Sequence, residues 1–180
     1  MTLSTILKKM LIGKAFTTER GRIRTFNKLD WVLYPSRGAA QLLQEVGTAA
    51  GRDFLFDIGR ESGASLMADI MAVISVDDSN LKTSHESLME FINFLGFGEL
   101  QFLAFEVDGK RNRIGFRNIN NPISEYEIKI YGNKSLACDF FHGLFTGFLE
   151  RELSLKNLKL TESKCVRKGS SYCEWETKAK

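Results

Sequence analysis

Apolar residues recur at helical spacing between residues 38 and 74. They are Ala39, Leu42, Leu43, Val46, Ala50, Phe54, Leu55, Ile58, Leu66, Ile70 and Ile74. Steps of three and four residues place such side chains on one face of an α-helix. Gly51 and Asp53 interrupt the pattern and predict a helix end followed by a new N-cap. We therefore expect two consecutive helices in this part of the chain.

Two pairs of glycines, each four residues apart, fall within these helices: Gly47 with Gly51 and Gly59 with Gly63. This spacing leaves bare backbone on one helix face and allows another helix to approach closely. We expect these faces to pack in the core or in a dimer interface.

Three further helices are predicted. Residues 1–16 form a short amphipathic helix that either docks on its own domain, exchanges with a partner subunit or lies on a membrane surface. Thr83 and Glu86 form a capping box for a helix that ends at Gly96. The last helix spans residues 135–152, and its inner face carries Leu136, Phe140, Phe141, Leu144, Phe145, Phe148 and Leu149.

Apolar and polar residues alternate in three segments, 100–107, 113–118 and 124–131, which predicts three β-strands. Asp108 and Gly109 provide a hairpin turn between the first two. Residues 21–34 are expected to form one or two short strands, and residues 159–177 a terminal hairpin. The fold class predicted is α+β, an antiparallel sheet with one face covered by helices.

Composition is that of an ordinary globular protein, with 43% hydrophobic and 26% charged residues among 180. We expect one domain spanning residues 1–180, in which residues 1–36 contribute to a homodimer. The net charge of +3 comes from dispersed basic residues, which does not favour direct nucleic-acid binding. No apolar run reaches the roughly 20 residues that span a bilayer.

Motifs for secretion and for common catalytic chemistry are not found. The N-terminal segment has no signal-peptide pattern, so a cytoplasmic protein is expected. No phosphate-binding loop, dinucleotide fingerprint or nucleophile motif occurs, which favours a binding protein over an enzyme.

The chemistry-bearing residues lie in the last third of the chain. Folding the terminal hairpin about Gly169 places Cys165 opposite Cys173, close enough to share one metal ion or to form a disulfide. Cys138 lies in the first turn of the last helix, where the helix dipole favours a thiolate. Glu162 is the nearest carboxylate for a fourth ligand, although a bulge must turn it toward Cys165. Three unrelated buried thiols are the remaining alternative.

This pattern of Cys138, Glu162, Cys165, Gly169 and Cys173 resembles the vinyl-4-reductase-type, hydrocarbon-binding domain. The likeness covers residues 38–177 and includes the Leu95-Gly96-Phe97-Gly98-Glu99 turn. The resemblance implies a structural zinc ion held by these three cysteines and the glutamate, as in the phenol-sensor domains of bacterial activators. More distant relatives are the vesicle-tethering, TRAPP-type trafficking subunits, which hold an acyl chain.

The chain has 14 phenylalanines, many on faces assigned to the interior. Such rings either pack solidly or leave an apolar cavity, and the resemblance favours a cavity between the sheet and the helices. His85 is either an exposed residue at a helix start or a polar anchor for a ligand. The expected pocket residues are His85, Phe91, Phe94, Phe102, Phe105, Phe116, Phe141 and Phe145.

The leading hypothesis is a sensor domain that binds a small apolar or aromatic ligand and passes occupancy to a downstream regulatory protein. Two alternatives remain open at this point. One is an enzyme or accessory protein that acts on a tetrapyrrole-like ring. The other is a scaffold protein whose core is completed by an acyl chain.

Overall fold

The computed structural model describes residues 16–19, 22–25, 29–32, 34–73, 92–93, 95–107 and 112–177. Within these ranges it has four α-helices: α2 (Ser36–Ala50), α3 (Arg52–Val73), α5 (Pro122–Tyr131) and α6 (Ala137–Glu152). The predicted N-terminal helix, most of the capping-box helix and the Asp108-Gly109 turn lie outside the described residues. The expected α+β class is confirmed.

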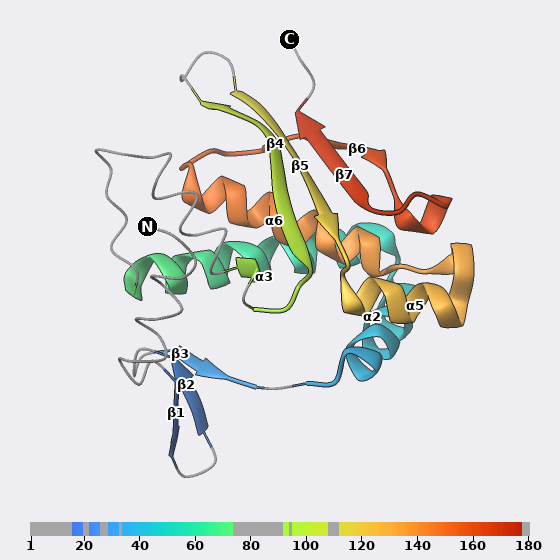
Figure 1. Cartoon of the computed structure of the whole chain (residues 1–180), viewed down its shortest axis with the longest axis horizontal. Coiled ribbons are helices and arrows are strands. Elements are labelled where there is room, and N and C mark those ends of the chain that lie inside the picture. The colour runs from blue at the N-terminus through green and yellow to red at the C-terminus, as the bar shows by residue number, and fades with distance from the viewer. Residues whose placement is uncertain are drawn as a thin grey trace.

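The main sheet has four antiparallel strands in the order β4-β5-β7-β6 (Figure 1). Its strands are β4 (Glu99–Val107), β5 (Asn112–Ile119), β6 (Leu160–Lys164) and β7 (Cys173–Thr177). A second sheet contains β1 (Phe16–Glu19), β2 (Arg22–Thr25) and β3 (Leu29–Trp31). The predictions of two strands near residues 100–107 and 113–118 and of a terminal hairpin are confirmed.

The third predicted strand, residues 124–131, is wrong, because this segment is helix α5. Pro122 occupies the start of the helix, where its missing N–H costs nothing. The Asn121 side chain caps the helix by accepting hydrogen bonds from the N–H groups of Ile123 and Ser124. The fully buried residues of α5 are Ser124 and Glu127, three apart, whereas Ile130 is exposed. The alternating isoleucines therefore gave a misleading strand pattern.

Helices α3 and α6 cross with their backbones in contact. A Cβ atom placed on Gly59 or Gly63 would lie 2.2 or 2.0 Å from a backbone oxygen of α6. Gly143 and Gly147 of α6 face α3 in the same way, at 2.0 Å each. The predicted close packing of Gly59 and Gly63 is therefore confirmed as core packing. Gly51 instead ends α2, with φ of +96°.

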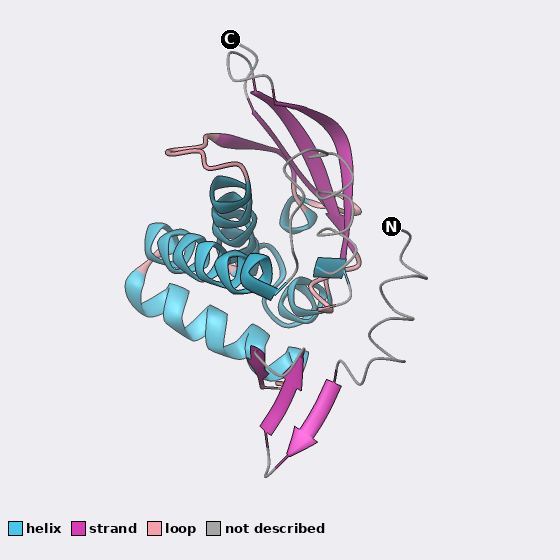
Figure 2. Cartoon of the chain, turned by 90° about the vertical axis from the view of Figure 1, so that its left-hand side faces the viewer, coloured by secondary structure: helices cyan, strands magenta, loops and turns pink. Residues whose placement is uncertain are grey.

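Helix α6 lies between α3 and the inner face of the main sheet (Figures 1 and 2). On the apolar side of α6, Phe145 contacts two aromatic residues of the sheet. Its ring centroid lies 5.7 Å from that of Phe116 in β5 and 5.8 Å from that of Trp175 in β7. The expectation that the last helix covers the sheet is confirmed, although the helix begins at Ala137 rather than residue 135.

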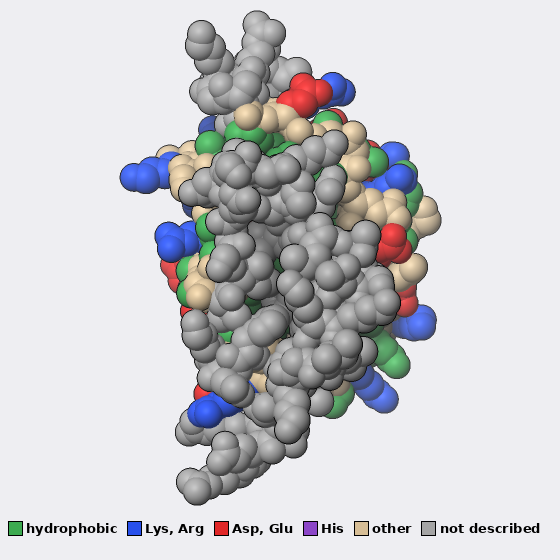
Figure 3. Space-filling view, turned by 60° about the vertical axis from the view of Figure 1, so that its left-hand side comes forward, with side chains coloured by type: hydrophobic (Ala, Val, Ile, Leu, Met, Phe, Trp, Pro, Cys, Tyr) green, Lys and Arg blue, Asp and Glu red, His purple; other side chains and the backbone are tan. Residues whose placement is uncertain are grey.

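Charged side chains of both signs are visible around the margin of the face shown in Figure 3. On the face shown in Figure 3, lysine and arginine side chains of the described residues are interspersed with aspartate and glutamate and do not gather in one patch. Among the described helices, none combines the length and apolar character needed to cross a bilayer.

Candidate metal centre

The three cysteines converge in the interior from three different elements. Cys138 is the second residue of α6, Cys165 follows β6, and Cys173 begins β7. The Sγ atom of Cys173 lies 3.7 Å from that of Cys138 and 3.9 Å from that of Cys165. All three sulfurs lie within 4.8 Å of one another, and all three residues are buried. They are free thiols, so the disulfide alternative does not describe this structure.

The two separations from the Cys173 sulfur, 3.7 and 3.9 Å, match the edges of a metal-centred tetrahedron. Zn–S bonds of about 2.3 Å in tetrahedral geometry place the sulfurs roughly 3.8 Å apart. Three thiolates suit zinc or another thiophilic metal, because soft sulfur donors select such ions. The donor set therefore fits the zinc ion that the family resemblance implies.

A bulge in β6 brings Cys165 to this position. Glu162 pairs with Trp175, but Lys164 pairs with Glu174, so β6 has one more residue than β7 between these pairs. The predicted irregularity between Glu162 and Cys165 is therefore present. After the bulge, the 3-10 turn η3 (Val166–Lys168) ends at Gly169, whose left-handed φ of +91° returns the chain toward β7.

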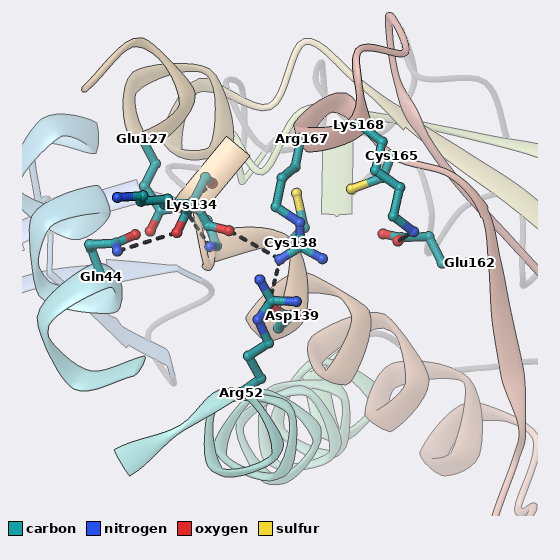
Figure 4. A network of polar contacts seen from close by, with 12 residues as sticks. Gln44, Arg52, Glu127, Lys134, Cys138, Asp139, Glu162, Cys165, Arg167 and Lys168 are labelled. Carbon is teal, nitrogen blue, oxygen red and sulfur yellow. Dashed lines mark hydrogen bonds and ion pairs between the residues drawn. The ribbon is translucent and has the colours of Figure 1, made fainter. Parts of the chain in front are cut away.

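Glu162 lies beside Cys165 but outside the sulfur trio. Its Oε2 atom accepts a hydrogen bond from Nζ of Lys168 at 2.9 Å (Figure 4). Burial, together with a hydrogen bond to Cys165, raises the pKa of the Glu162 carboxyl. The cluster of possible metal ligands consists of the three cysteines and does not include a Glu162 oxygen, so the role of Glu162 as the fourth ligand stays a prediction.

Hydrogen bonds within the sulfur trio shift the pKa values of the three cysteines in different directions. Hydrogen bonds from the thiols of Cys138 and Cys173 lower the pKa of Cys165. A hydrogen bond to Cys165 is the main cause that raises the pKa of Cys138, with contributions from Cys173 and burial. For Cys173 the hydrogen bond with Cys138 lowers the pKa, but Cys165 and burial outweigh it and raise the pKa to about 12. The expectation that the helix terminus makes Cys138 the acidic thiol is therefore wrong.

Arg167 provides positive charge close to the trio. Its Nη1 atom donates hydrogen bonds to the carbonyl oxygen of Ser135 at 3.0 Å and to Oδ2 of Asp139 at 2.7 Å. The arginine side chain is only 8% exposed, so water screens its charge weakly. Sequence reasoning did not identify Arg167, because nothing in the spacing shows that it would turn inward from η3.

The expected pocket residues do not all line one space. Phe102, Phe116 and Phe145 border a cavity of about 10 Å³ between the sheet and α6, together with Leu100, Phe148 and Leu149. Phe105 contacts Phe102, with ring centroids 5.6 Å apart, but does not line this cavity. Phe91, Phe94 and His85 lie outside the described residues.

Phe141 faces a second and more polar cavity of about 40 Å³. This cavity adjoins the metal centre, because Cys138 and Cys173 also line it, and its other walls include Asn118, Asn121, Ser124 and Trp175. An apolar cavity that binds benzene measures about 150 Å³. The apolar space at Phe145 is much smaller than that, so its aromatic side chains must separate before a ring-sized ligand can enter.

Comparison with known proteins finds solved structures with a similar fold. No protein-family model matches the chain, and no curated protein sequence does. Among solved structures, the phenol-responsive sensory domain of the transcription activator PoxR, determined with phenol, is similar to this chain with a TM-score of 0.71. The identity is 15%, over 99% of this chain and 92% of that one.

Two further structures are similar. Trafficking protein particle complex subunit 3 from Naegleria fowleri, covalently bound to palmitic acid, gives a TM-score of 0.56 at 17% identity, over 81% of this chain and 95% of that one. A vinyl-4-reductase family protein from Methanocaldococcus jannaschii gives 0.46 at 20% identity, over 86% and 85%. The chain thus has a fold of the type that the sequence resemblance indicated, and the similarity to PoxR is the strongest of the three.

Proposed function

We propose that this chain is a binding domain for a small apolar or aromatic molecule, with a structural zinc ion beside the binding space. Cys138, Cys165 and Cys173 would supply three ligands to the ion and Glu162 the fourth. The convergence of three buried sulfurs from α6, β6 and β7 is the observation that carries this proposal. A metal bound by four protein side chains supports structure rather than catalysis, because no coordination position stays open for a substrate.

The position of the metal centre suggests what the ion does for the domain. Cys138 belongs to the helix that forms one wall of the apolar interior, and the other cysteines lie at the end of β6 and the start of β7, two neighbouring strands of the opposite wall. A bound ion would fix α6 to the terminal hairpin and limit relative movement of these walls. A wall held in place before binding loses less conformational freedom on binding, which favours affinity.

The ligand class rests on the aromatic interior and on the fold. The proposed binding space lies between the sheet and α6 at Phe102, Phe116 and Phe145, and we propose that Phe105, Phe141, His85, Phe91 and Phe94 contribute to its surroundings. The PoxR sensory domain was solved with phenol and the trafficking subunit with palmitic acid, and both have TM-scores above 0.5 to this chain. We propose binding without turnover, in a homodimer that reports occupancy to a regulatory partner.

The test is titration of the zinc-loaded full chain with phenol and, separately, with palmitic acid, followed by calorimetry and native mass spectrometry. We expect saturable binding of one of the two probes. Leu149→Trp fills the space at Phe145 and should weaken that binding by at least about tenfold, a loss of roughly 1.4 kcal/mol. Leu103→Trp is the matched control, because Leu103 is 50% exposed on the sheet and lines neither cavity.

Two results would contradict the proposal. One is the absence of saturable binding of both probes to folded, zinc-loaded protein. The other is equal weakening by Leu149→Trp and Leu103→Trp, which would place any bound probe outside the space between the sheet and α6. Native mass spectrometry of the same samples would show whether the chain is a dimer and whether it retains a ligand from the cell.

A further inference from the structure

Glu127 is a carboxylate with no solvent exposure in the interface between α5 and the start of α6. Its Oε2 atom accepts hydrogen bonds from the hydroxyl of Ser135 and from the backbone N–H of Ala137. Burying a carboxylate costs several kcal/mol unless specific partners compensate for the lost water. The contacts with Ser135 and Ala137 therefore have to compensate for the burial of Glu127.

The contact with Ala137 satisfies a free donor at the first turn of α6. The first N–H groups of a helix have no partners inside the helix. A side chain just before the helix usually accepts a hydrogen bond from one of them. Leu136, at that position in α6, cannot do so and makes no side-chain capping bond. Glu127 performs this role from a neighbouring helix and therefore determines where the first turn of α6 lies. Cys138 is the next residue in that turn.

The same segment is held from the opposite side by the terminal hairpin. Arg167 donates hydrogen bonds to the carbonyl oxygen of Ser135 and to Asp139, which bracket Cys138 in the sequence. Figure 4 shows Glu127 and Arg167 on different sides of the chain at Cys138. Arg167 belongs to η3, only two residues after Cys165, so it connects the two elements that the sulfurs join. Glu127 in turn fixes residues 135–137 to helix α5.

We infer that Glu127 is a positioning residue of the metal centre, which holds the first turn of α6 so that the Cys138 sulfur reaches the other two. This inference rests on the proposed metal site. It differs from a general stabilising role, because it predicts a loss of metal affinity that exceeds what loss of stability alone produces. Partners that orient metal ligands typically contribute about 10- to 100-fold to metal affinity.

The experiment measures zinc affinity by chelator competition in three folded full-length proteins. Glu127→Ala removes both acceptor contacts and should lower zinc affinity by at least about tenfold. Glu127→Gln should stay within about threefold of the wild type, because its amide oxygen can accept from Ser135 and Ala137. The other carboxylate oxygen, Oε1, has no hydrogen-bond partner among the described residues, so replacing it with an amide nitrogen breaks no bond there.

Glu150→Gln is the matched control at the other end of α6. Glu150 makes a two-pronged ion pair with Arg60 at 2.7 and 2.8 Å and accepts from the N–H of Leu158. Its replacement should lower the free energy of unfolding without changing zinc affinity. If Glu127→Ala does not fold, Glu127→Asp replaces it, because the shorter carboxylate cannot keep both contacts.

Cobalt substitution provides a second readout that a structural role alone would not change. The thiolate-to-cobalt absorption should indicate three sulfur ligands in the wild type and in Glu127→Gln, and fewer in Glu127→Ala. Wild-type affinity and an unchanged cobalt spectrum in Glu127→Ala would overturn the inference while leaving the metal site intact. Failure of the wild type to bind zinc or cobalt would instead overturn the proposed function on which it rests.

Discussion

The carbonyl oxygen of Phe56 in α3 lies directly against Gly143 in α6. A Cβ atom at residue 143 would stand 2.0 Å from this oxygen, well inside van der Waals contact. The contact is between backbones, so no side-chain rotation could relieve it. Helix α6 therefore packs against α3 with no room for a side chain at residue 143, and this position places Cys138 and the apolar face of α6 relative to the sheet.

Gly143→Ala should lower the free energy of unfolding by about 3 kcal/mol or more, because the helices must separate to admit the methyl group. Urea unfolding followed by circular dichroism would measure the loss. Gly115→Ala is the control, since a Cβ atom there would have ordinary contacts at 3.8 Å. Equal stability of the two variants would show that α3 and α6 are not packed in this way.

Asn121 should be the most sensitive residue at the start of α5. Its oxygen accepts from Ile123 and Ser124 at 3.1 Å, and its amide donates to the carbonyl of Phe97 at 2.8 Å and to Asn118 at 3.0 Å. Asn121→Ala removes the cap and these donors and should cost about 2–3 kcal/mol in thermal or urea unfolding. Asn121→Asp keeps the cap acceptor and should cost less. A neutral Asn121→Ala would argue against helix α5.

His142 makes stability depend on pH in a direction set by its burial. Burial lowers the pKa of His142, and its Nε2 atom contacts the carbonyl oxygen of Leu160 at 3.2 Å. The unfolded chain therefore binds a proton first as the pH falls through about 6.5, and stability should fall from there toward the lower pKa of the folded state.

The measurement compares the free energy of unfolding at about pH 7.5 and about pH 5.5 in the wild type and in His142→Gln. The wild type should lose more stability than the variant over this interval. Both proteins contain the same three cysteines, so the pH dependence of the sulfur trio cancels in the comparison. The same pH dependence in both proteins would show that His142 is not buried as a neutral ring.

The sequence was sufficient for features that depend on short-range patterns. The apolar stripe predicted α2 and α3, the glycines Gly59 and Gly63 predicted a close helix contact, and the hairpin spacing predicted that Cys165 and Cys173 would meet. These succeeded because helical periodicity and strand register are local properties. The bulge near Glu162 was also predicted, because strict strand alternation would place Glu162 and Cys165 on opposite faces of the sheet.

Features that depend on tertiary polar contacts could not be predicted in this way. Residues 124–131 alternate like a strand, but Asn121, Pro122 and the burial of Glu127 make a helix, and the contact of Glu127 with Ser135 is not visible in any spacing. The acidity expected for Cys138 failed for the same reason, since a hydrogen bond to Cys165 that no spacing reveals is the main cause that raises the pKa of Cys138.

Metal analysis of the purified chain, kept reduced and free of chelators, tests the central proposal most directly. Three sulfurs from α6 and the terminal hairpin lie within 4.8 Å of one another, so the account predicts about one zinc ion per chain, lost in Cys138→Ser and Cys173→Ser together with thermal stability. Less than about a tenth of an ion per chain, with both variants as stable as the wild type, would contradict it.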